Sequence, residues 1–132
     1  MTEHQASTPA EYPSPYAFDA TLQRVTQAIV TAGMQIFATI DHAANAREAG
    51  LTMAPGTVLI YGKAAGGTPI MQAVPLAALD LPLRVLIYET AAGQTMIAAH
   101  PIAPMLIAAS VPEELAARLE PAEALLLKAI AS

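Results

Sequence analysis

The segment LRVLIYETAAGQTMIAA, residues 83–99, holds two apolar runs that are separated by a short turn. Residues 83–89 and 95–99 supply the strand-forming side chains, and Gly93 lies between them. Because parallel strands need a much longer connection, a link this short indicates an antiparallel β-hairpin. His100 and Pro101 then end the second strand of this hairpin.

Two more strands are expected upstream of this hairpin. Residues 34–40 and 57–61 consist largely of side chains that favour strands. In the first of these runs, the alternation of side chains predicts that Ile36, Ala38 and Ile40 share one face of the sheet.

Helices are expected on both sides of the strands. Residues 18–32 repeat apolar side chains at steps of three and four, which is typical of an amphipathic helix, and Gly33 follows as a C-terminal stop. A further helix is expected from residue 42 to Gly50, with Asp41 as its N-terminal cap.

Prolines mark the remaining helix starts. A short helix is expected to begin at Thr68 and Pro69, because proline fits the first turn of a helix. From Pro104 onward, the sequence contains two Ala/Leu-rich segments, and Pro112 and Pro121 suit their starts.

This order of elements predicts an α+β fold, in which an antiparallel-rich sheet is covered by helices mainly on one face. The 132 residues suit one domain, which we expect to occupy residues 17–132. Residues 1–16 are polar and broken by three prolines, so we expect a flexible tail or an edge strand there.

The composition indicates more apolar material than a chain of this size can bury. Apolar residues make up 55% of the chain and charged residues only 13%. Burial of the excess apolar surface between subunits is the simplest outcome, so we expect a homodimer.

Several classes of protein are disfavoured by composition. The chain has no cysteine, so thiolate chemistry and disulfides are excluded, and its six scattered Lys and Arg residues argue against nucleic-acid binding. Residues 90–111 are uncharged, but their prolines, glycine, glutamine and histidine argue against a membrane span. The first 16 residues lack the apolar run of a signal peptide, and we expect a cytoplasmic protein.

Four stretches, taken together in this order, resemble the bacterial domain-of-unknown-function 302 family. They are FDATLQRVTQAIVTAGMQIFATIDHAANAREAGL (18–51), TVLIYGKAAGGTPIMQAVP (57–75), LAALDLPLRVLIYE (76–89) and the hairpin segment 93–100. The resemblance covers residues 18–130 and implies a fold similar to that of the TATA-box-binding protein and association as a dimer. It implies no biochemical activity, because the family has none established.

The chain departs from the family pattern in two places. The usual N-terminal strand falls on the proline-broken segment before Tyr16, and the usual Gly-Asn-Pro is replaced by Gly62-Lys63-Ala64. A fold shared with a DNA-binding protein is not evidence of DNA binding.

Asp41 and His42 form the first candidate site, at the junction between a strand and a helix. A carboxylate beside an imidazole is suited to acid–base chemistry or to metal binding. The simpler interpretation, which we favour, is that Asp41 caps the helix and His42 occupies its first turn.

The glycine-rich segment GKAAGGT, residues 62–68, is the second candidate. Glycines that open a helix can present backbone amides to an anion, and we consider Gly62, Lys63, Gly67 and Thr68 as ligand-binding residues. The position of Lys63 does not match a Walker A motif, and the interpretation that we favour is a structural turn in which Thr68 caps the helix.

Asp80 is the third candidate, either as a second carboxylate or as part of a turn with Leu81 and Pro82. His42, His100 and Glu89 add possible metal donors, but no His spacing supports a metal site, and we predict none. No cofactor is indicated.

Two functional hypotheses follow. The favoured one is a non-enzymatic dimeric domain that binds a small ligand or a partner protein near Asp41, His42, residues 62–68 and Asp80. The alternative is a small enzyme in which Asp41 and His42 transfer a proton while the amides of Gly67 and Thr68 hold an anionic group.

Overall fold

The structure is a computed structural model and describes residues 8–131. Five strands form one antiparallel sheet in the order β1-β5-β4-β3-β2. The strands are β1 (Ala10–Pro13), β2 (Gln35–Asp41), β3 (Gly56–Gly62), β4 (Leu83–Glu89) and β5 (Thr95–Ala99). The predicted α+β fold and the hairpin of residues 83–99 are therefore confirmed.

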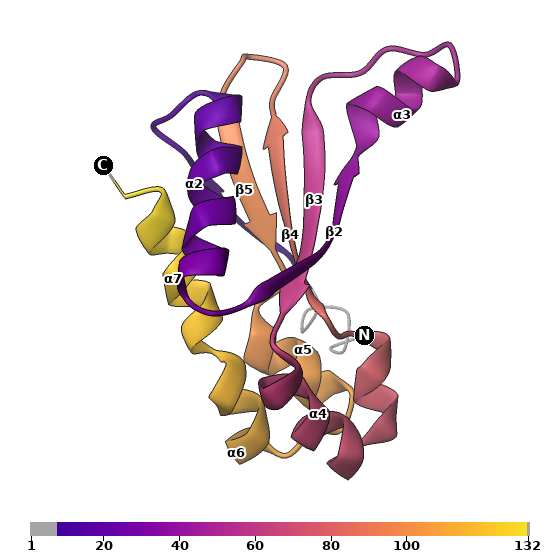
Figure 1. The fold of residues 1–132 in the computed structure, drawn as a ribbon, viewed down its shortest axis with the longest axis vertical. Coiled ribbons are helices and arrows are strands. Elements are labelled where there is room, and N and C mark those ends of the chain that lie inside the picture. The colour runs from indigo at the N-terminus through magenta and orange to yellow at the C-terminus, as the bar shows by residue number, and fades with distance from the viewer. Residues whose placement is uncertain (1–7, 132) are drawn as a thin grey trace.

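The helical elements lie against one face of the sheet and at its two ends (Figure 1). They are α2 (Phe18–Thr31), α3 (His42–Glu48), α4 (Ala64–Ala73), the 3₁₀ turn η1 (Pro75–Leu79), α5 (Ile102–Ala108), α6 (Glu113–Ala116), the 3₁₀ turn η2 (Ala117–Leu119) and α7 (Pro121–Ala129). In Figure 1, α3 lies at what we call the upper end of the sheet, and α4, α5 and α6 gather at the lower end.

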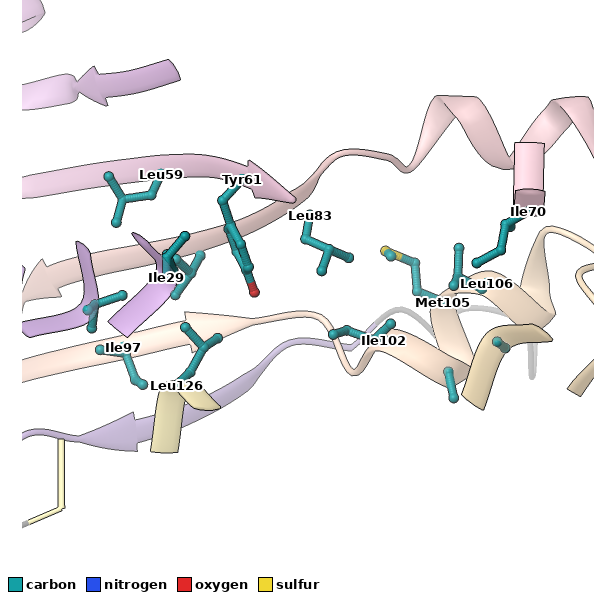
Figure 2. Packing of buried hydrophobic residues seen from close by; sticks show 14 of the residues in the cluster. Ile29, Leu59, Tyr61, Ile70, Leu83, Ile97, Ile102, Met105, Leu106 and Leu126 are labelled. Atoms are coloured by element: carbon teal, nitrogen blue, oxygen red, sulfur yellow. The ribbon is translucent and has the colours of Figure 1, made fainter. Parts of the chain in front are cut away.

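The core lies between the sheet and the α2 and α7 helices. Val25 and Ile29 on α2 are fully buried, as the helical periodicity predicts, and they share one apolar cluster with Leu59 on β3 and Ile97 on β5. Leu126 on α7 joins the same cluster, and Figure 2 shows it converging with Ile29, Leu59 and Ile97 between the layers.

Gly33 ends the first helix in the expected way. Its φ of 85° lies in the left-handed region, and its amide donates a hydrogen bond to the Val30 carbonyl at 3.0 Å. The Met34 amide bonds the Ile29 carbonyl at 3.1 Å, so the last turn of α2 closes directly into β2.

The expectation that Ile36, Ala38 and Ile40 share one face is wrong, because β2 contains a bulge. Ile36 lies opposite Tyr61, whereas Ala38 lies opposite Ile60, the next residue along β3. The bulge at this point moves Ala38 and Ile40 to the face opposite Ile36.

The expected start of a helix at Thr68 is also wrong. The α4 helix begins at Ala64, where the amides of both Gly66 and Gly67 donate to the Lys63 carbonyl. Pro69 therefore lies inside the helix rather than in its first turn.

Two further differences involve prolines. Pro104 lies in the first turn of α5, a helix that we did not expect. Proline is tolerated at this position because the amides of the first turn have no intrahelical partner. Near the N-terminus, the segment broken by prolines forms β1, which pairs with β5 at the edge of the sheet. Proline is tolerated at such an edge. Residues 1–7 of the expected tail lie outside the described residues.

Candidate functional site

Asp41 caps the α3 helix. Its Oδ1 accepts a hydrogen bond from the Ala44 amide at 2.9 Å, and its backbone is extended, as expected of a residue that precedes a helix. Both Asp41 and His42 are exposed at the upper end of the sheet. The capping interpretation is confirmed. The Oδ1 atom of Asp41, one of the two carboxylate oxygens of the candidate acid–base pair, is engaged by the Ala44 amide.

The structure does not bring Asp41 and the glycine-rich segment together. Asp41 pairs with Thr57 at one end of the β2–β3 ladder, whereas Gln35 pairs with Gly62 at the other. Six residues of strand separate the two ends, which corresponds to about 20 Å. The predicted site residues 41–42 and 62–68 therefore belong to opposite ends of the sheet.

Within the glycine-rich segment, Gly62 is buried, Gly67 is half-buried, and Lys63 and Thr68 are exposed. The Lys63 ammonium group approaches Gly33, since a Cβ placed on that glycine would lie 3.6 Å from the Lys63 Nζ. Lys63 thus reaches toward the turn between α2 and β2.

Asp80 lies at the lower end, immediately after η1, and is half-buried. His100 follows β5 at this same end, whereas Glu89 lies at the upper end, as Asp41 and His42 do. The suggested metal donors are therefore divided between two ends, and within residues 8–131 no three His, Asp or Glu side chains are grouped to hold a metal.

A small cavity at the lower end gathers polar groups from distant parts of the sequence. Tyr61, Asp80, Arg84, His100 and Glu123 all line it, and the space open to the centre of a water molecule is about 20 Å³. That volume suits a single water. Asp80 is thus the one predicted site residue that joins this group.

Tyr61 is the most deeply buried of these polar residues, at 1% exposure. Figure 2 shows its hydroxyl pointing from β3 toward the gap between Leu126 and Ile102. Burial raises the pKa of Tyr61, because the phenolate would lose its hydration, and the negative charge of Glu123 raises this pKa further. The hydroxyl therefore stays protonated at neutral pH.

His100 has a buried ring nitrogen without a partner. Its Nδ1 is shielded from solvent and makes no hydrogen bond. An unsatisfied buried polar atom costs roughly 1–3 kcal/mol. Since such atoms are uncommon in folded proteins, His100 is a candidate for a functional role.

Arg84 lies beside His100 on the face of the sheet opposite α2. It is exposed, and within residues 8–131 its guanidinium forms no ion pair. Arg84 and His100 together line a wider pocket of about 190 Å³. We call this hollow the Arg84–His100 pocket.

Sequence reasoning missed Tyr61, Arg84 and Glu123 as members of a site. Each belongs to a different element, on β3, β4 and α7 respectively, and nothing in their spacing indicates that they meet. A partial signal was the termination of β5 at His100, because polar residues at strand ends often line binding sites.

Residues 8–131 form an α+β domain with one five-stranded antiparallel sheet and a small polar cavity at its lower end. The chain belongs to the family described as Domain of unknown function DUF302, whose family model matches residues 10–132. A crystal structure of an uncharacterised conserved DUF302 protein from Bacillus stearothermophilus matches with a TM-score of 0.82 at 17% identity, covering 93% of this chain and 98% of that one. This likeness confirms the fold.

The chain is also similar to proteins named as fluoride-specific ion channels. It is 38% identical over 77 residues to "Fluoride-specific ion channel FluC 1" of Brucella suis and of Brucella abortus, a match that covers 58% of this chain. The matched segment makes up 30% and 28% of those two relatives, so it spans under a third of their length. Within residues 8–131, no helix is long and apolar enough to cross a membrane.

Proposed function

We propose that this chain is a non-enzymatic cytoplasmic domain that forms a homodimer and binds a small ligand or a partner protein. The observation that carries the proposal is the apolar face of the sheet that points away from α2. Its side chains are only half-buried, although the neighbouring core positions of the same strands are fully buried.

The strand register defines this surface, which we call the open face. Val58 lies opposite Leu86, and Tyr88 lies opposite Met96, so these four side chains share one face. The open face comprises Ala38, Ile40, Val58, Ile60, Leu86, Tyr88, Met96 and Ala98, with Glu11 and Arg84 as the charged strand residues on it.

A second copy of the chain is the occupant that fits this surface best. Five strands spaced by about 4.8 Å and up to seven residues long make a patch on the order of 500 Å², not counting the extra area contributed by the side chains. Standard interfaces bury about 800 Å² per partner. Two such faces can stack as an aligned sandwich, with a shared apolar core about 10 Å thick.

The similarity to the Brucella proteins supports association rather than catalysis. In those relatives, the related segment is part of a longer protein that is named as a fluoride channel. In those relatives, a related segment is thus joined to additional sequence. Binding of a partner protein by this chain would likewise be a function of association rather than of catalysis.

The acid–base alternative has less support from the geometry. Asp41 already caps α3, and residues 62–68 lie at the other end of the sheet from His42. An enzyme of that kind would need its anion-binding group near the proton-transferring pair.

The dimer is tested by measuring mass in solution, with light scattering coupled to size exclusion, for the wild type and three variants. We expect a wild-type mass of twice 13.7 kDa. Met96→Glu and Ile40→Glu place charges on the open face and should shift the protein to monomer. Val30→Glu, at a position on α2 that is 55% exposed, is the matched control and should remain a dimer.

Circular dichroism confirms that each variant is folded before its mass is interpreted. A wild type that stays monomeric at high micromolar concentration would overturn the dimer. A dimer that is unchanged by both open-face charges would place the interface elsewhere.

A further inference from the structure

The Arg84–His100 pocket lies where the open face meets the lower end of the sheet. Its floor is apolar and is formed in part by Val58, Leu86 and Ala98, and two nitrogen-rich side chains border it. At about 190 Å³ it is smaller than the roughly 300–1,000 Å³ typical of drug-sized sites, so it suits a small molecule.

Arg84 supplies an uncommitted positive charge to this pocket. Its direct cross-strand neighbour is Ile60, an apolar residue. Within residues 8–131, no carboxylate lies within ion-pair distance of the guanidinium, although Asp80 and Glu123 line the cavity behind it. A guanidinium offers five fixed donors and no acceptor, and its geometry matches a carboxylate.

His100 supplies a second donor. Because its Nδ1 is buried without a partner, the less costly neutral tautomer carries the proton on Nε2 and leaves only an acceptor unpaired. The Nε2 atom makes no hydrogen bond within the described chain and is not among the buried unpaired atoms. It is therefore free to donate to a molecule in the pocket.

An apolar floor bordered by two donors fits a ligand with an apolar body and one anionic end. We infer that the Arg84–His100 pocket binds a small organic monocarboxylate, with its carboxylate on Arg84 and the Nε2 of His100. The inference rests on the proposed function only in that the chain binds a small ligand. The negative groups of Asp80 and Glu123 nearby disfavour ligands of higher charge.

Val58, Leu86 and Ala98 belong both to the pocket and to the open face. A second copy stacked on the open face would therefore close over the carboxylate's apolar body. Binding is therefore measured on the wild-type protein as monomer or dimer, whichever it forms. The mass of the protein in solution is recorded in the same buffer, so that the association state during binding is known.

The test is isothermal titration of the purified chain with benzoate and cyclohexanecarboxylate, compared with benzamide and with sodium fluoride and sodium chloride. Benzamide keeps the ring but has no charge, and the inorganic anions have charge without an apolar body. We expect both carboxylates to bind and the other three probes to bind at least about tenfold more weakly, because charge-assisted hydrogen bonds are the stronger ones.

Substitutions locate the site. Arg84→Met should weaken carboxylate binding by about tenfold or more, and His100→Leu should weaken it by a smaller factor. Arg118→Met is the control, because it removes one exposed arginine from η2, outside the pocket. It should leave the affinity within about twofold.

Each contrary result has a separate meaning. Equal binding of benzoate and benzamide, or benzoate binding that survives Arg84→Met, would overturn the carboxylate inference while leaving small-ligand binding intact. Binding of fluoride or chloride alone would replace the organic acid by an inorganic anion. No binding of any probe would overturn the inference, whereas the mass measurement decides the dimer independently.

Discussion

The Glu123 carboxylate on α7 accepts a hydrogen bond from the Ile102 amide, the first residue of α5. This bond joins residues that are 21 positions apart in sequence and lie on two different helices, and it satisfies an amide that has no partner within its own helix. Glu123 therefore acts as an N-terminal cap supplied from outside the helix. It also lines the cavity that contains Tyr61.

Replacement of Glu123 by alanine should lower the free energy of unfolding by about 1–3 kcal/mol, because it leaves a partly buried amide unpaired. Glu123→Gln keeps an acceptor at the same place and should lose less. Urea unfolding measures both, with the exposed Glu120→Ala as the control. If Glu123→Ala unfolds at the same urea concentration as the control, the bond does not stabilise the fold.

Loss of the Asp41 cap should also destabilise the protein. Asp41→Ala removes the acceptor of the Ala44 amide and should cost about 0.5–2 kcal/mol, whereas Asp41→Asn retains a capping oxygen. Thermal unfolding followed by circular dichroism compares the two variants. An Asn variant as unstable as the Ala variant would show that the charge matters more than the cap.

A core substitution tests the packing of α2 on the sheet. Ile29 is fully buried, so Ile29→Ala should reduce the free energy of unfolding by about 2–5 kcal/mol. Its exposed neighbour Val30 provides the comparison, and Val30→Ala should change stability by less than about 1 kcal/mol. Similar losses at the two positions would contradict the orientation of α2.

Tyr61 predicts a loss of stability in alkali. Its pKa in the folded protein is raised above the ordinary value of 10, so its neutral form is favoured by folding. The associated stability is fully present below pH 10 and falls as the pH rises from there toward the folded pKa, because the unfolded chain releases this proton first.

Urea midpoints measured from pH 8 to beyond pH 10 test this dependence. Tyr61→Phe should show a shallower decline above pH 10 than the wild type. Part of the decline should remain, since a hydrogen bond to Glu11 also raises the pKa of Tyr88. The exposed Tyr12→Phe should follow the wild-type curve. Identical curves for Tyr61→Phe and the wild type would remove Tyr61 as the cause.

The sequence predicted those features that depend on local periodicity and on residues close together in the chain. The α2 helix, the stop at Gly33, the Asp41 cap and the hairpin of β4 and β5 follow from side-chain spacing and turn chemistry. The bulge in β2 did not, because it is a property of pairing with β3 and leaves no mark in the alternation around Ala38.

The candidate site was less predictable than the fold. Asp80 was identified, but its companions Tyr61, Arg84 and Glu123 come from three elements whose meeting depends on the whole topology. Conversely, Asp41 and Lys63 lie at the ends of consecutive strands and were expected to share a site, but the antiparallel pairing of β2 and β3 carries them to opposite ends of the sheet.

The β2 bulge affects how copies of the chain can assemble. β2 is one of the two edge strands of the sheet, the other being β1, and a neighbouring chain could add its own strand there and extend the sheet without limit. The extra residue between Ile36 and Ala38 breaks the regular ladder that such an addition requires. The bulge therefore disfavours polymerisation into long fibres through this edge. Self-association through the open face, by contrast, would end at a dimer, because each copy buries its apolar surface against the other.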